Sequence, residues 1–302
     1  MTRPPFPTVL DSSIIATFRS CPRKFELEYL HHWKPLNESV HLIAGGAYAA
    51  GLETARKAFY SGECDSQEAI AAGLGVLLST YGDFQCPPDS AKSAERTAGA
   101  YEFYFDNYPL ETDEIKPLNL PGGKLGVEFS FAEPIEVTHP ETGDPILYCG
   151  RMDMIGNYAG GIYGLDDKTT SQLGASWPKQ WDLRSQFTGY TWGAQRAGLH
   201  LQGFLVRGVS ILKTKYDTLQ AITYRPAWQL DRWYQQLCRD VERMKVMWED
   251  GYFDYNLDHA CTEYGGCTFR QICLMQDPTA WLEGSFERRV WNPITREEEV
   301  LS

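Results

Sequence analysis

Long apolar runs and internal repeats are both missing from this chain of 302 residues. No stretch of about 18 or more apolar residues occurs, so the sequence offers no candidate transmembrane helix. The opening run, MTRPPFPTVLDSS, has no apolar stretch of the kind that a secretory signal contains. We therefore expect a cytoplasmic protein with no membrane association.

Positive charge is also scarce. Lysine and arginine total 28 against 40 aspartates and glutamates, a formal net charge of −12. This sign is wrong for a protein that coats nucleic acid generally. A local basic groove that follows phosphates can still exist beside a carboxylate site. The candidates for such a groove, which are alternatively plain solvated surface, are Arg19, Arg23, Lys24, Lys179, Arg184, Lys213 and Lys215.

The overall composition is that of an ordinary folded protein. Hydrophobic residues make up 43% and charged residues 23% of the chain, which excludes a disordered or fibrous class. The eight cysteines are expected to be free thiols or metal ligands, because the reducing cytosol disfavours disulfides. We expect a single domain over 1–302.

The pattern of apolar residues predicts a mixed α/β architecture. Helical spacing over 12–31 is interrupted at Cys21-Pro22, which predicts two short helices with a break that presents Cys21. The further elements, in order, are a helical block over 42–110 with helices near 42–60, 67–80 and 91–108; strands at 124–131, 146–158 and 161–168; a helix at 178–198; strands at 203–212 and 217–224; and a helix at 227–250. This order favours a mixed central sheet flanked by helices.

Two neighbouring strands carry a group of charged residues. In the run from Gly161 to Thr170, strand alternation places Asp166 and Lys168 on one face and Asp167 on the other. The preceding strand carries Asp153 within an apolar run, and a hairpin that turns at Gly160-Gly161 would bring it beside Asp166. Two carboxylates and an ammonium group would then converge.

Such a group suits hydrolysis of a phosphodiester. Mg²⁺ or Mn²⁺ prefers oxygen ligands, and two carboxylates supply them, while Lys168 adds a fixed positive charge. Alternatively, Asp166-Asp167-Lys168 is a strand end with a surface ion pair. Glu128, on the strand before, is either a further ligand or a residue that faces solvent.

Gln186 and Tyr190 stand four residues apart within the predicted helix 178–198, and so share one helical face. Their polar ends could reach a substrate or order Lys168. A helix side that mixes aromatic core with capped polar groups is the alternative.

Three cysteines near the end of the chain, Cys261, Cys267 and Cys273, are each separated by five residues, and Cys21 is the natural fourth. Four thiolates suit structural zinc or a [4Fe–4S] cluster, and the absence of close C-x₂₋₄-C pairs favours iron and sulphur. Such ligation would join 12–34 to 255–280 and act structurally. The alternative is unrelated buried thiols, the state expected of Cys64, Cys86, Cys149 and Cys238.

Together these motifs resemble the RecB-type PD-(D/E)XK nucleases. The chain is more closely similar to the iron–sulphur members, which include CRISPR-associated spacer-processing exonucleases, the AddB nuclease domain and phage relatives. The resemblance spans Ser12 to Cys273 and rests on family order. Its pieces are Ser-x₇-Cys-Pro-Arg-Lys-Phe, Gly-Arg-Met-Asp, Asp-Asp-Lys-Thr, Gln-x-x-x-Tyr and the terminal cysteine triplet.

The resemblance implies a restriction-endonuclease-like fold and a role for each matching residue. Asp153 and Asp166, with Glu128 less firmly, would ligate Mg²⁺ or Mn²⁺. The residues that would assist catalysis or complete the motif are Lys168, Gln186 and Tyr190, and those that would hold a [4Fe–4S] cluster are Cys21, Cys261, Cys267 and Cys273.

One family position departs from the pattern. Many relatives carry a metal-binding histidine in a helical Gly-x-x-x-His run, where this chain has Ala49. This argues against two-metal chemistry and leaves a one-metal site. Glu53, one turn later, is either a partial substitute or a solvated helix residue.

The leading expectation is a metal-dependent DNA exonuclease or end-processing nuclease of recombination or repair, of phage or mobile-element type, acting on ends or single strands. A recombinase or single-strand-binding protein is a possible partner. The runner-up is a catalytically weak iron–sulphur DNA-binding module, which the acidic charge and Ala49 favour. An electron-transfer protein is a third class, disfavoured because the sequence has no second redox motif.

Overall fold

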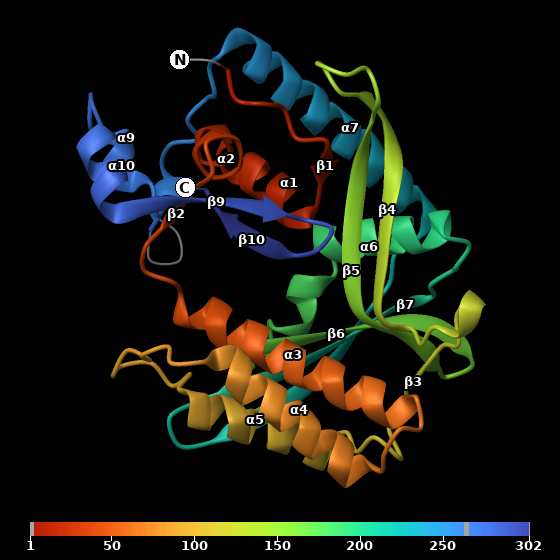
Figure 1. Ribbon diagram of the computed structural model, residues 1–302. Coiled ribbons are helices and arrows are strands. Elements are labelled where there is room, and N and C mark those ends of the chain that lie inside the picture. Colours follow the sequence, from red (N-terminus) through yellow and green to blue (C-terminus); the bar gives the residue numbers. More distant parts are fainter. Residues whose placement is uncertain (1–2, 263–265, 302) are drawn as a thin grey trace. The chain divides into compact units, whose positions relative to one another are not determined.

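The computed structural model describes residues 3–262 and 266–301. The chain divides into two compact units (Figure 1). Unit 1 comprises Met1–Asn37, Phe131–Gly150 and Ala227–Ser302, and unit 2 comprises Glu38–Ser130 and Arg151–Pro226. Each unit is assembled from segments far apart in the sequence. The expectation of one domain over 1–302 stays a prediction.

In the part of the chain that the structure describes, the main sheet has seven strands and is mixed. Its order is β1 (Val9–Leu10), β5 (Pro145–Tyr158), β6 (Gly161–Thr170), β7 (Gly203–Ile211) and β8 (Tyr216–Thr223), with β3 (Lys116–Pro117) and β4 (Val127–Thr138) also pairing with β5. The pairs β1·β5 and β6·β7 are parallel, whereas β5·β6 and β7·β8 are antiparallel. The expected mixed central sheet with flanking helices is confirmed.

Strands β5 and β6 form a hairpin with a two-residue turn. Tyr158 pairs with Gly161, and the turn residues Ala159 and Gly160 have φ values of 48° and 81°. Positive φ at both positions matches the right-handed twist of paired strands. The hairpin was expected, but its turn lies one residue earlier than the predicted Gly160-Gly161.

Three helices of unit 2 form a layer beside the sheet, in which two helices contact β6, β7 and β8 and the third packs on those two helices (Figure 1). They are α3 (Val40–Tyr60), α4 (Ser66–Tyr81) and α5 (Ala94–Asn107). Each begins at a side chain that accepts from the first turn: Ser39, Asp65 and Ser93. Such caps satisfy amide groups that the helix leaves unpaired. The three helices expected between 42 and 108 are therefore present.

The segment predicted as one helix over 178–198 is divided. A 3₁₀ turn covers Pro178–Trp181, and α6 covers Ser185–Arg196. The buried Arg225 guanidinium donates to the carbonyls of Trp181, at 2.6 Å, and Arg184, at 3.3 Å. These carbonyls are thus satisfied from outside the helix, which supports the break.

Unit 1 contains one long helix, several short helical elements and a second sheet. Its helical elements are α1 (Ser12–Ser20), α2 (Pro22–Phe25), a π-helical turn (Glu26–Leu30), α7 (Ala227–Asp250), α8 (His259–Thr262), α9 (Arg270–Cys273) and α10 (Thr279–Ser285). Its second sheet is β10 (Glu297–Val300), β9 (Phe286–Asn292) and β2 (Trp33–Pro35). Cys21 is extended, with φ −161°, between α1 and α2, as the Cys-Pro break predicted.

Candidate functional site

Asp153 and Asp166 lie on the paired strands β5 and β6. The ladder of paired residues runs to Met154 opposite Leu165, and the next positions in this register are Asp153 and Asp166. The Asp167 backbone N–H donates to Asp153 Oδ2 at 2.7 Å, so the Asp153 side chain is held against β6. Asp166 is only 2% exposed. The hairpin therefore brings the half-buried Asp153 beside the buried Asp166.

The electrostatics of Asp153 reflect this crowding. Burial raises the pKa of Asp153 well above its ordinary value, and the neighbouring carboxylates of Asp166 and Asp167 raise it further. Lys168 acts in the opposite direction, and Glu128 adds a smaller unfavourable charge. A cation at this position would relieve the repulsion.

Lys168 forms an ion pair with Asp166, two residues earlier on the same strand. Burial alone would lower the pKa of Lys168, but the charges of Asp166 and Asp153 outweigh burial and raise it. The ammonium group is therefore charged at neutral pH. Its side chain keeps 32% of its surface exposed, so it can meet a substrate.

Glu128 stands near this group in an unusual backbone conformation, with φ 56°. Its side chain is 10% exposed and pairs with Arg151 Nε at 2.6 Å. Glu128 also lines a groove of about 830 Å³ together with Lys57 and Lys124. The side chain is thus shielded and paired rather than free in solvent, while its role as a ligand stays a prediction.

Gln186 and Tyr190 face one another on α6. Gln186 Nε2 donates to the Tyr190 hydroxyl at 2.9 Å, which fixes both polar ends. Between them, Phe187 stacks on Phe204 of β7 with ring centroids 5.0 Å apart. The helix side therefore combines a polar pair with aromatic core, while contact of this pair with a substrate or with Lys168 stays a prediction.

The position of the family histidine holds Ala49, within α3. Glu53, one turn later, forms an ion pair with Lys57 on the same helix. Its carboxylate is 27% exposed. A helix-surface ion pair is the local state of Glu53.

Arg56 is a residue of the site that the sequence reasoning missed. It is 2% exposed, and its guanidinium pairs with Asp167 at 2.7 Å and donates to the Tyr104 hydroxyl at 2.6 Å. That hydroxyl also accepts from Arg207, which binds Asp113 through two hydrogen bonds of 2.7 and 2.6 Å. Buried ion pairs and hydrogen bonds thus connect β6 to α3 and α5.

A signal for Arg56 existed in the sequence. Tyr48, Leu52 and Arg56 recur every four residues, and the first two are buried. An arginine on the apolar face of a helix calls for a buried acidic partner. Strand alternation had already placed Asp167 on the face opposite Asp166, where Arg56 reaches it.

Several of the basic residues proposed for a groove are already paired. Arg19 pairs with Asp240 at 2.7 Å, Arg23 with Glu26, and Lys24 with Glu28 at 4.0 Å. Lys213, in contrast, lines a cavity of unit 2. The pairing leaves less net positive charge in unit 1 than the residue list suggested.

The four clustered cysteines lie together in unit 1. Cys21, Cys261, Cys267 and Cys273 all line one cavity of about 340 Å³, with Arg270 among the other residues. Burial raises the pKa of Cys267, and the thiols of Cys21 and Cys261 contribute to this shift. Cys64, Cys86, Cys149 and Cys238 are not among the residues that line this cavity. All eight cysteines are free thiols.

The described residues, 3–262 and 266–301, contain neither a ready-made metal-binding cluster nor a membrane-spanning helix. No group of three or more His, Cys, Asp or Glu side chains there stands ready to hold a metal ion. Within the same residues, no helix combines the length and apolar character needed to cross a membrane.

The mixed α/β fold presents Asp153, Asp166 and Lys168 on one β-hairpin. Residues 12–274 match the family model of the PD-(D/E)XK nuclease superfamily, and the chain belongs to this superfamily. The match covers most of the 302 residues. It supports a hydrolytic nuclease with DNA as the substrate implied by the family.

The other comparisons are more distant. No curated protein sequence matches. A crystal structure from Eubacterium rectale, named as a candidate exonuclease, is 14% identical and covers 85% of this chain and 88% of its own, with a TM-score of 0.48. The structure of a protein named SSO0001 is 13% identical and covers 66% of this chain and 74% of its own, with a TM-score of 0.31.

Proposed function

We propose that this chain is a metal-dependent DNA nuclease that trims or processes DNA ends, in recombination or repair. The observation that carries the proposal is the meeting of Asp153, Asp166 and Lys168 on the paired strands β5 and β6. Membership of the PD-(D/E)XK superfamily gives this arrangement its chemical meaning.

The carboxylates fit a hard divalent cation. Asp166 is buried and Asp153 is half-buried, their negative charges oppose one another, and their oxygens are the ligands that Mg²⁺ and Mn²⁺ prefer. Asp153, Asp166 and, as a third donor, Glu128 would hold the ion. When bound, such an ion polarises the scissile phosphate and makes a nearby water more acidic.

The remaining residues orient the reaction. The Lys168 ammonium stays charged beside Asp166, where it can stabilise negative charge that develops on the phosphate. The Asp167 N–H keeps one Asp153 oxygen turned towards β6. The Gln186–Tyr190 pair offers a fixed amide and hydroxyl for substrate contact from α6.

We assign a structural [4Fe–4S] cluster to the four cysteines of unit 1. The proposal rests on four thiols around one cavity, contributed by segments far apart in the sequence. Thiolate ligands with this wide spacing suit an iron–sulphur cluster better than zinc. Metal analysis and visible absorption of anaerobically purified protein distinguish the two.

Substitution of Asp166 tests the enzyme directly. Wild-type protein with Mg²⁺ or Mn²⁺ should shorten labelled linear DNA, and Asp166→Ala should lose this activity by a factor of at least about 10³, because a ligand and the partner of Lys168 are both removed. Asp231→Ala, an exposed aspartate on α7, is the matched control and should keep full activity. If wild-type protein leaves the labelled DNA intact and Asp166→Ala behaves identically, the nuclease proposal is refuted.

A DNA-binding module without efficient cleavage is the second candidate. Ala49 at the family histidine position favours it, because one expected ligand is missing. Filter binding that retains DNA, together with calorimetry that detects no Mg²⁺ or Mn²⁺ uptake, would select this candidate over the nuclease.

A further inference from the structure

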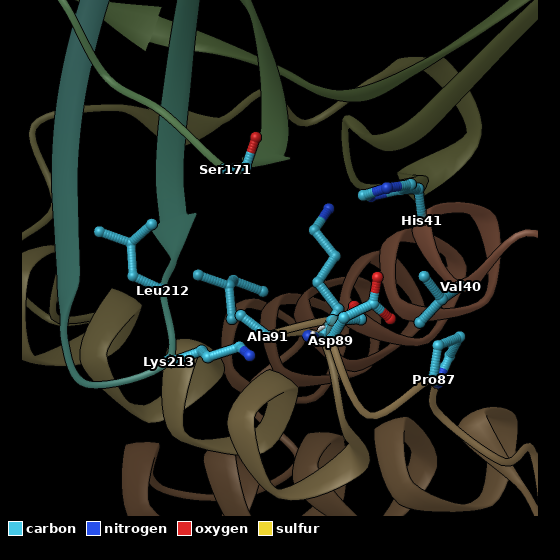
Figure 2. A pocket seen from close by; sticks show the side chains of 11 residues that line it. Val40, His41, Pro87, Asp89, Ala91, Ser171, Leu212 and Lys213 are labelled. Atoms are coloured by element: carbon cyan, nitrogen blue, oxygen red, sulfur yellow. Dashed lines mark hydrogen bonds between the residues drawn. The ribbon is translucent and has the colours of Figure 1, made fainter. Parts of the chain in front are cut away.

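A cavity of about 600 Å³ in unit 2 carries chemistry that the proposed carboxylate site does not use. Its polar lining combines two lysines, a histidine and two hydroxyls with one aspartate: Lys92, Lys213, His41, Ser90, Ser171 and Asp89. Figure 2 shows His41, Ser171 and Lys213 on different sides of the cavity. The lining thus carries a net positive charge in a strongly acidic protein.

Lys92 is the unusual member of this lining. It is only 4% exposed, and its ammonium group donates to Thr169 Oγ1 at 3.1 Å. Among the described residues, this hydroxyl is the one hydrogen-bond partner of the ammonium group, which enters no ion pair. Burial lowers the pKa of Lys92. A buried ammonium group that faces only a hydroxyl lacks its natural counter-charge.

The backbone around Lys92 is held firmly. The Tyr81 hydroxyl donates to the Lys92 carbonyl at 2.7 Å, and the Lys92 N–H donates to Ser90 Oγ at 3.2 Å. The segment before α5 therefore holds its lysine at the cavity wall. An ammonium fixed in this way suits a defined anion better than a flexible surface lysine does.

The cavity begins where the strand of the carboxylate site ends. Thr169 directly follows Lys168 on β6, and Ser171 directly follows the strand. Strand alternation turns Thr169 to the face opposite Lys168. The cavity and the proposed reaction site thus share strand β6, but the cavity is lined by different residues.

We propose that this cavity binds a phosphate group of the nucleic-acid substrate, with Lys92 and Lys213 as its cationic contacts and Ser90 and Ser171 as hydroxyl donors. The inference rests on the proposed nuclease function and names a contact for its substrate. Phosphate offers several acceptor oxygens to such donors at once. The phosphate is either a terminal phosphomonoester or a phosphodiester within the strand.

Inorganic phosphate tests the cavity without any need for cleavage. Titration calorimetry on the full chain should detect phosphate binding that Lys92→Met and Lys213→Ala each weaken by at least about tenfold, since each removes a charged contact. Lys215→Ala is the matched control, because Lys215 is exposed and outside the lining, and it should bind like wild type. Lys213 is also exposed, so a folding defect cannot explain its effect.

Oligonucleotides then identify the source of the phosphate. If it is terminal, removing the 5′ or 3′ phosphate of linear single-stranded DNA should raise the wild-type KM but not that of Lys213→Ala. If it is internal, Lys213→Ala should raise KM about equally on phosphorylated and dephosphorylated ends.

Wild-type protein that binds no phosphate, or variants that bind it as wild type does, would overturn the inference. If Lys92→Met and Lys213→Ala lose phosphate binding but the wild-type protein never cleaves DNA, the nuclease proposal is refuted and the phosphate site in the cavity still stands.

Discussion

Arg56 connects the stability of unit 2 to the geometry of its carboxylates. Replacing Arg56 by methionine leaves Asp167 buried without its cation, and the free energy of unfolding should fall by about 3–5 kcal/mol. Urea denaturation measures this loss. Adding Asp167→Asn to the same variant should recover a large part of it, because the uncompensated charge is then gone.

Lys57→Met is the matched control for Arg56. Lys57 lies next to Arg56 but pairs with Glu53 on the helix surface, and it should change the free energy of unfolding by no more than about 1 kcal/mol. Equal effects of the two substitutions would contradict the assignment of Arg56 to a buried anchor.

Lys92 predicts a pH dependence of folding. Its pKa is lowered by burial, so the folded chain releases this proton at a lower pH than the unfolded chain does. Below the pKa of Lys92 in the folded chain, the buried charge lowers the free energy of unfolding by its full amount. As pH rises from there towards the ordinary lysine pKa of about 10.4, this loss of stability is relieved. In that window wild type should gain stability relative to Lys92→Met. A constant difference in urea denaturation across the same pH values would contradict this sign.

Local rules were enough to place Asp153, Asp166 and Lys168, but not Arg56 or Lys92. Strand alternation and a hairpin turn decide which residues of β5 and β6 share a face. Arg56 and Lys92 meet β6 only after helices pack on the sheet, and that packing depends on contacts between distant segments. Spacing along one segment cannot supply such contacts.

At the level of elements, Gly164 on β6 leaves room for the ring of Phe204 on β7. A Cβ added at Gly164 would lie 2.1 Å from a ring atom of Phe204, which is fully buried and stacked on Phe187. Gly164→Ala should therefore lower the free energy of unfolding by about 1–3 kcal/mol. Gly46→Ala, in open space on α3, should instead raise it by about 0.5–1 kcal/mol. Thermal unfolding shows whether the signs differ.

Prediction by periodicity worked for long elements and missed several short ones. Helices α3, α4, α5 and α7 show their apolar pattern over several turns. The hairpin of β9 and β10 is largely exposed or half-buried, so it has no apolar alternation to reveal it. The break between Trp181 and Ser185 depends on Arg225, some forty residues later in the chain.

On the scale of the whole chain, unit 1 is assembled from segments that the sequence separates widely. Met1–Asn37 and Ala227–Ser302 belong to one unit, although all of unit 2 lies between them in the sequence. Closing so long a loop is costly in chain entropy, and each crosslink between the two segments offsets part of that cost. The four thiols around one cavity come from these same two segments.

A bound cluster would therefore stabilise unit 1 in particular. By analogy with a disulfide that closes a loop of this size, ligation of Cys21 and Cys261 contributes about 5 kcal/mol. Cys21→Ser should remove the visible absorption of the cluster and speed hydrogen exchange in α1 and α9. Exchange in α3 and α5 of unit 2 should change much less, because those helices belong to a separate compact unit. Hydrogen-exchange mass spectrometry measures both.

Cys86→Ser provides the matched control, since Cys86 is a free thiol that does not line the cavity. It should keep the absorption, the iron content and the exchange pattern of wild type. Loss of absorption in both variants would mean that thiols in general are needed. Iron that survives Cys21→Ser would show that this cysteine is no ligand, and the link between the two segments of unit 1 would then depend on packing such as the Arg19–Asp240 ion pair.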